Sequence, residues 1–190
     1  YASVEQTGFR TFLRRDGCFA ELFRREEACD MSIGMNTLQI EETDPENGLR
    51  AEVCYFVLPE ERLGALVRRV RITNTGTQSC RMEVLDGMPE LVPYGVDDAA
   101  LKQMVQTIKA SMQVEDVAAR RPYYRVRASQ KDTAQVSEVA GGNFALGFAE
   151  DGALLPVVAD IRAVFSYYTA LKRPLVFWEQ GCAGVLAQEQ

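Results

Sequence analysis

The stretch LVRRVRITNTGTQSCRMEVLDG, residues 66 to 87, contains two runs of alternating residues around an Asn-Thr-Gly-Thr turn signal. In the first run, Leu66, Val70 and Ile72 fall on one face of a strand, because side chains at every second position point the same way. A second run, residues 80–85, alternates in the same manner. The two runs therefore predict an antiparallel hairpin.

The same stretch carries four arginines, which raises the question of a phosphate-binding patch. Arg68 falls on the apolar face, whereas Arg69 and Arg71 point the other way. A cross-strand contact of Arg69 or Arg71 with Glu83 would neutralise part of this row, at about 0.2 to 1 kcal/mol per pair. We interpret these side chains, Arg81 included, mainly as strand exterior. Arg68 is the exception, which we expect at a sheet edge, extended outward, or paired with an acid.

Short strands separated by turns are predicted over most of the chain. Turn signals such as Asp-Pro-Glu-Asn-Gly at 44–48 recur at roughly the spacing of all-β sandwiches and barrels. Further turns are expected at 16–17, 141–143 and 150–152, and residues 159–172 suit a short helix or a loop. The predicted strands outside 66–87 are 8–13, 18–23, 31–41, 49–58, 123–129, 133–139, 143–149, 157–158 and 175–178.

One segment, residues 97–116, changes to helical periodicity. Asp97 or Asp98 can cap its first turn, and its apolar stripe is expected to pack on a sheet. The sequence thus predicts a mainly β protein, a large antiparallel β-sandwich with one inserted amphipathic helix. The apolar stripe consists of Leu101, Met104, Val105, Ile108 and Met112.

Composition favours one globular domain over residues 1–190. Hydrophobic residues make up 47% and charged residues 25%, and the net charge of -6 argues against nucleic acid or an anionic membrane as a partner. No apolar run approaches the roughly 20 residues of a membrane span, and no signal peptide opens the chain. Since the chain begins at Tyr1 within patterned sequence, we expect a fragment of a longer protein.

The sequence offers few groups for catalysis or metal binding. It contains no His, which excludes His-based catalysis and most zinc sites. The odd number of dispersed cysteines predicts reduced, mostly buried thiols in a cytoplasmic protein. The cysteines are Cys18, Cys29, Cys54, Cys80 and Cys182.

Motif searches likewise assign no catalytic residue, no metal ligand and no cofactor, and they leave substrate-binding residues unknown. Neighbouring acids such as Glu41 and Glu42 point to opposite faces of a strand, so they are not an acid/base pair across a glycosidic bond. Calcium-loop, phosphate-loop and G-x-S-x-G patterns are absent, and Gly141-Gly142 is interpreted as a hairpin turn.

Three adjacent aromatic pairs are the candidates for sugar contact. They are Tyr123-Tyr124, Tyr167-Tyr168 and Phe177-Trp178. In a strand, one member of each pair would point outward, where a Tyr or Trp can stack on a sugar face. Packing is the more frequent role of such residues. Trp178 is the first position to mutate if sugar binding is found.

Three segments, CDMSIGMN (29–36), YFVLPEERLGALVRRVRITNTGTQSCRMEVLDGMPELVPYGV (55–96) and PYYRVRASQKDTAQVSEVAGGNFALGF (122–148), carry a family resemblance. Together they resemble the β-sandwich domain of inverting glycoside phosphorylases related to cellobiose phosphorylase, with β-1,2-oligoglucan phosphorylases the most similar branch. The resemblance implies a galactose-mutarotase-like supersandwich fold.

In that family the catalytic Asp lies in a separate (α/α)6 barrel and protonates the glycosidic oxygen while inorganic phosphate attacks the anomeric carbon. This chain has no such barrel pattern, so the resemblance assigns it no catalytic residue. It implies a supporting domain whose partners are the barrel and linker of the same parent chain, a homodimer mate, and a β-glucan oligosaccharide. We also expect an exposed apolar patch where the neighbouring domain would dock.

Two other functions fit the sequence. An independent carbohydrate-binding module would carry Trp and Tyr beside polar side chains on a concave sheet face. A purely structural or oligomerisation domain would show a flat apolar patch and bind no ligand.

Overall fold

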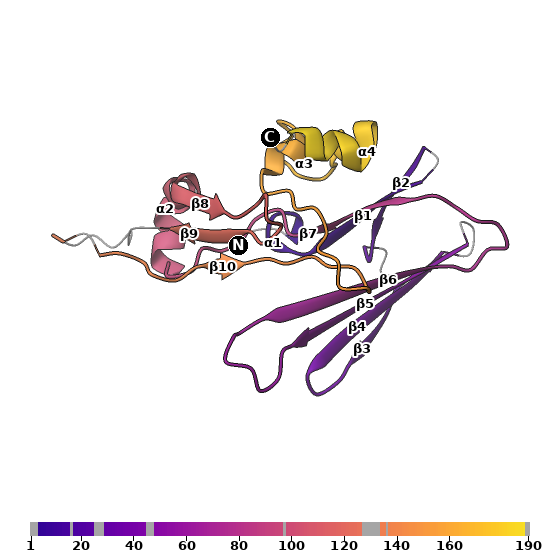
Figure 1. Cartoon of the computed structure of the whole chain (residues 1–190), viewed down its shortest axis with the longest axis horizontal. Coiled ribbons are helices and arrows are strands. Elements are labelled where there is room, and N and C mark those ends of the chain that lie inside the picture. The colour runs from indigo at the N-terminus through magenta and orange to yellow at the C-terminus, as the bar shows by residue number, and fades with distance from the viewer. Residues whose placement is uncertain are drawn as a thin grey trace. The chain divides into compact units, whose positions relative to one another are not determined.

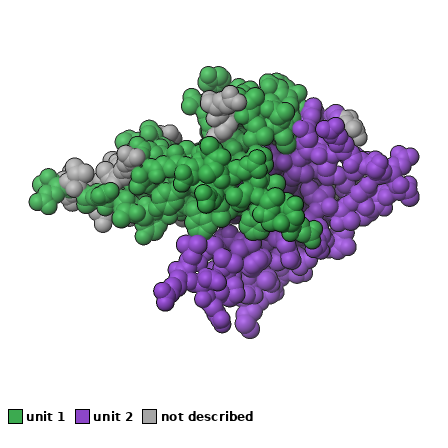
Figure 2. Space-filling view, in the orientation of Figure 1, with its two compact units in different colours: residues 1–8, 88–190 green, residues 9–87 purple. Residues whose placement is uncertain are grey.

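The computed structural model describes two compact units, which are coloured separately in Figure 2. The first consists of Tyr1–Gly8 and Met88–Gln190, and the second of Phe9–Gly87. Each is described by itself below, with the helices and strands labelled as in Figure 1. The single domain over 1–190 stays a prediction. The residues described are 4–15, 17–24, 29–44, 48–96, 98–126, 134–135 and 137–188.

The unit Phe9–Gly87 is built from two antiparallel sheets (Figure 1). One sheet has the order β3-β4-β5-β6, and the other has the order β2-β1-β7. The four-stranded sheet contains β3 (Cys29–Ile33), β4 (Thr37–Asp44), β5 (Leu49–Val57) and β6 (Leu66–Asn74). The three-stranded sheet contains β1 (Arg10–Arg15), β2 (Cys18–Leu22) and β7 (Glu83–Gly87).

Alternation along β5 places the core of this unit. Leu49, Ala51 and Val53 are buried, while Arg50 lies on the opposite face and forms an ion pair with Glu41. The Glu41 carboxylate, through a hydrogen bond and its charge, raises the pKa of Arg50 above its ordinary value. The antiparallel sheets of this unit, with alternating buried and exposed residues, confirm the prediction of a mainly β, β-sandwich-like fold.

The hairpin predicted over residues 66–87 is wrong. Strand β6 pairs with β5, whereas β7 pairs with β1 in the other sheet. The Asn74 side chain does form a local turn, accepting a hydrogen bond from Gly76 N and donating one to Gln78 O. That turn leads the chain out of the sheet. Alternation identified both strands, but it carries no information about which strand each one pairs with.

The other unit combines a small antiparallel sheet with helices (Figure 1). Its sheet has the order β10-β9-β8. The strands are β8 (Met112–Glu115), β9 (Tyr123–Val126) and β10 (Asn143–Phe144). The helices are α1 (Val4–Thr7), α2 (Asp98–Ser111), α3 (Ile161–Phe165) and α4 (Leu175–Gln188).

The inserted helix is confirmed as α2. It ends at Ser111, and the chain continues directly into β8, so the last residues of the predicted helix are a strand. Ile108 is fully buried, in agreement with the predicted stripe, and Lys109 pairs with Glu90 at 2.6 Å. The predicted cap Asp97 lies outside the described residues.

The strand predicted at Leu175–Trp178 is wrong, because this segment begins helix α4. Helix α4 is kinked at Gly181, whose φ of 70° and ψ of -168° are not helical, so it consists of two helical stretches. Val176 and Phe177 are buried before the kink and Val185 after it. Read alone, the four apolar residues Leu-Val-Phe-Trp look like a buried strand, and a short apolar run does not separate the two structures.

The other strand and turn predictions of this unit have mixed outcomes. The strand expected at 157–158 is wrong, whereas a short helix within 159–172 is confirmed as α3 and the turn at 150–152 is confirmed beside the Phe148–Leu154 bridge. Residues 127–133 lie outside the described residues.

The two glycines at 141 and 142 precede β10, and no turn is assigned there. A Cβ on Gly142 would lie 2.5 Å from the Tyr124 carbonyl oxygen and 2.7 Å from the Tyr123 ring. Close approach to β9, rather than a turn, therefore requires glycine.

We expect Gly142→Ala to destabilise the protein by about 1 to 3 kcal/mol, because backbone or ring atoms must shift to admit the methyl group. Urea unfolding measures this loss. Gly64→Ala is the matched control, since its Cβ would meet nothing within 4 Å. Equal unfolding midpoints for the two variants would contradict the close approach.

Candidate functional site

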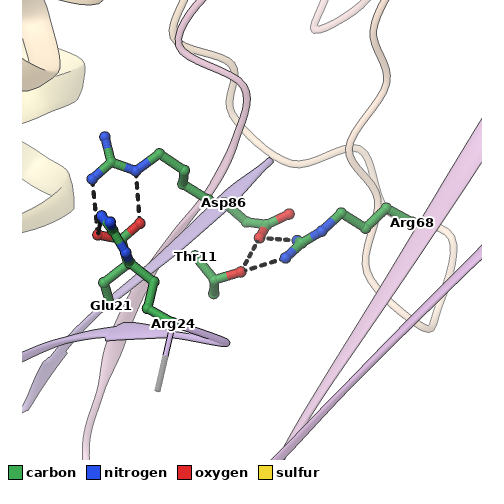
Figure 3. A network of polar contacts seen from close by, with 6 residues as sticks. Thr11, Glu21, Arg24, Arg68 and Asp86 are labelled. Atoms are coloured by element: carbon green, nitrogen blue, oxygen red, sulfur yellow. Dashed lines mark hydrogen bonds and ion pairs between the residues drawn. The ribbon is translucent and has the colours of Figure 1, made fainter. Parts of the chain in front are cut away.

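A polar cluster within the unit Phe9–Gly87 surrounds Arg68, the third residue of β6. Its side chain is only 4% exposed and forms an ion pair with Asp86 on β7. Arg68 also donates to the Thr11 hydroxyl at 2.7 Å and to the Tyr55 hydroxyl at 2.9 Å. Thr11 in turn donates to the Asp86 carboxylate at 2.6 Å, which closes the triangle seen in Figure 3. The cluster thus joins β6 to β1 and β7.

Aromatic rings complete the environment of Arg68. The guanidinium carbon lies 5.4 Å from the ring centroids of Phe9 and Tyr55 and 5.9 Å from that of Phe23. At these distances the ring faces attract the cation. Charge, hydrogen bonds and ring contacts together stabilise a buried guanidinium that would otherwise be costly to desolvate.

A second buried ion pair joins β1 to β2. Arg10 contacts both carboxylate oxygens of Glu21, at 2.7 and 2.8 Å, and the two side chains are 2% and 13% exposed. Arg24 reaches the same carboxylate at 3.2 Å, and Figure 3 shows Glu21 and Arg24 beside each other. Two contacts of this kind fix the orientation of the guanidinium.

These contacts decide whether the arginines of residues 66–87 form a phosphate-binding patch. Arg68 is paired with an acid on an edge strand, as predicted, and all three of its guanidinium nitrogens are engaged. Arg69 and Arg71 lie on the opposite face of β6, so these arginines do not converge on one phosphate. The cluster therefore fastens the sheets of this unit.

The predicted pairing of Arg69 or Arg71 with Glu83 is wrong. Glu83 lies opposite Arg14 in the β1–β7 pair and forms an ion pair with it. The cross-strand neighbours of Arg69 and Arg71 are Cys54 and Glu52. The error follows from the hairpin that the structure does not form.

Two surface cavities lie within single units. One of about 320 Å³ is lined by Arg14, Gly17, Arg81, Met82 and Glu83. Another of about 210 Å³ is lined by Asp160, Arg162, Ala163, Ser166, Tyr167 and Gln188. Each lining contains one carboxylate, and Asp160 accepts a hydrogen bond from Arg162 N as the cap of α3. Neither lining offers the pair of carboxyl groups that glycoside hydrolysis requires.

The aromatic candidates are dispersed rather than gathered on one sheet. Tyr123 and Tyr124 are half-buried on β9, and Tyr167 follows α3 with 87% of its surface exposed. Phe177 is buried and Trp178 half-buried, both on α4. A sheet face carrying Trp beside Tyr is therefore not found among the described residues.

None of the five cysteines forms a disulfide, in agreement with the prediction of reduced thiols, but they are not mostly buried. Cys18 is exposed and the other four are half-buried. Within the described part of the chain, His, Cys, Asp and Glu side chains do not gather in threes where a metal ion could bind. None of the helices described has both the length and the apolar character needed to cross a membrane.

Exposed apolar side chains gather on the four-stranded sheet. Met31, Ile33, Val57 and Leu66 are 63%, 75%, 56% and 57% exposed. The strand register places all four on the face that carries Arg68. The surface is thus not uniformly polar, and docking of a neighbouring domain at this face stays a prediction.

No protein-family model matches the chain, and no curated protein sequence matches it either.

Proposed function

We propose that this chain is a non-catalytic, β-sandwich-like module of a cytoplasmic glycoside phosphorylase that acts on β-glucan oligosaccharides. The choice of family is based on the resemblance of residues 29–36, 55–96 and 122–148 to inverting glycoside phosphorylases. The parent enzyme would hold its catalytic Asp in an (α/α)6 barrel. This chain would support the barrel and the oligomer.

The observation that carries the proposal is the partly uncovered apolar face of the four-stranded sheet. Val53 at its centre is fully buried, whereas Ile33 and Leu66 on the same face remain mostly exposed. Apolar side chains that gather in this way are typical of a surface that contacts another protein element. The buried Arg10 and Arg68 support a non-catalytic module as well. Each forms an ion pair within the fold, so its charge is not available to bind phosphate.

Phosphorolysis assays test whether this chain is a non-catalytic part of a phosphorylase. We expect no release of glucose 1-phosphate when this chain alone is incubated with β-1,2-linked glucan oligosaccharides and inorganic phosphate. The longer protein read from the same gene should release it. Activity of the isolated chain, or the lack of a helical-barrel pattern after Gln190 in the gene, would contradict the proposal.

A carbohydrate-binding module is the second candidate, and the exposed Tyr167 favours it. This ring lines the 210 Å³ cavity beside Asp160, Arg162 and Gln188, an arrangement able to stack on a sugar and contact its hydroxyl groups. Titration with short β-glucans, followed by Trp178 fluorescence, separates the two candidates. A saturable change that Tyr167→Ala abolishes would favour the binding module.

A further inference from the structure

The two edges of the four-stranded sheet differ sharply in charge. Edge strand β6 carries three arginines: Arg68 points to the inner face, and Arg69 and Arg71 point to the outer one. Edge strand β3 carries one charge, Asp30. Within the described residues, β3 has β4 as its strand partner and no other.

This difference matters because an edge strand presents backbone N–H and C=O groups to other chains. Charged side chains, above all those that point inward, prevent such pairing. Arg68 is an inward charge of this kind on β6, whereas the inner face of β3 presents Met31 and Ile33, 63% and 75% exposed. Only the β6 edge is therefore protected by its side chains.

We propose that β3 pairs with β3 of a second copy of this chain, antiparallel and about a two-fold axis at Met31. The two four-stranded sheets would then form one continuous sheet. The exposed apolar side chains of both β3 strands would cover each other. This pairing gives the oligomer of the proposed function a specific strand and register, and the experiments below test it without any assay of phosphorolysis.

Charge selects the register of this pairing. With Met31 opposite its own symmetry mate, Asp30 faces Ser32 of the second copy, and Cys29 faces Ile33. A shift that centres the pair on Asp30 sets two carboxylates directly opposite each other, which is destabilising. A shift that centres it on Ser32 leaves both Cys29 and Asp30 without an opposite strand residue. The Met31 register alone pairs all five residues without a like-charge contact.

The alternative pairings with β6 are less favourable. Self-pairing of β6 about Val70 places Arg69 opposite Arg71 twice. Pairing of β6 with β3 of another copy matches Arg71 to Asp30, but that contact is head-to-tail and repeats without closing, so it produces filaments. The β3 pairing closes after two copies.

Sedimentation velocity over a range of concentrations tests the proposal with the whole chain. We expect a dimer that does not grow further. Met31→Lys places two lysines opposite each other at the axis and should leave only monomer. Leu66→Lys is the matched control, because Leu66 lies on the same sheet face with 57% exposure but on the β6 edge. It should dimerise like the original chain.

The register is tested by a charge exchange. Ser32→Asp sets an aspartate opposite Asp30 at two symmetric positions and should weaken the dimer about tenfold. Adding Asp30→Lys converts both contacts to opposite-charge pairs and should restore it. Three results would overturn the proposal: a monomer at all concentrations, growth beyond the dimer, or an equal loss of dimer in Leu66→Lys and Met31→Lys.

Discussion

Replacing Arg68 with Ala should lower the free energy of unfolding by about 3 kcal/mol, within the range for breaking one partner of a buried ion pair. The substitution removes the charge that faces Asp86 and leaves the Thr11 and Tyr55 hydroxyls without their donor. The loss should fall toward the lower end of that range, since the Asp86 side chain is 35% exposed and water can solvate it. Urea unfolding followed by far-ultraviolet circular dichroism measures it.

Two further variants separate the charge of Arg68 from its geometry. Arg68→Lys keeps the charge but loses the planar fork that reaches Asp86, Thr11 and Tyr55 together, so about half of the loss should remain. Arg69→Ala removes an exposed arginine from the opposite face of the same strand and should change stability by no more than about 0.5 kcal/mol. An Arg68→Ala variant as stable as Arg69→Ala would show that the cluster contributes nothing.

The sequence predicted the faces of strands better than their partners. Alternation placed Arg68 on the apolar face of β6, and the buried ion pair with Asp86 follows from that placement. It could not predict that the acid would be Asp86, because β6 and β7 lie in different sheets. Pairing between strands depends on side-chain packing across the whole unit, and nearest neighbours in sequence were the wrong choice here.

The C-terminal segment shows the other limit of sequence patterns. Leu175 to Trp178 are apolar without interruption, so their periodicity does not distinguish a strand from a helix. The kink at Gly181, whose backbone angles are not helical, places Phe177 and Val185 on two helical stretches, so no unbroken helical period marks this segment in the sequence. For the 210 Å³ cavity, the sequence identified Tyr167 as an aromatic candidate. The polar residues beside this ring come from separate helices that only the fold brings together.

Replacing Phe177 with Ala should have the largest effect on the other unit, about 3 to 5 kcal/mol. Phe177 is fully buried and is among the largest fully buried side chains, so its removal forfeits its transfer free energy and leaves a cavity. Trp178, the only tryptophan, lies next to it on α4, and its fluorescence therefore follows unfolding of this part of the chain.

The matched control is Phe148→Ala, which removes the same side chain from a position that is 61% exposed. We expect its Trp178 unfolding midpoint to stay close to that of the original chain, because little buried surface is lost. If Phe177 belonged to a strand at the surface, the two substitutions would have similar effects. Equal shifts of the midpoint would thus contradict both the burial of Phe177 and the helical assignment of α4 on which it depends.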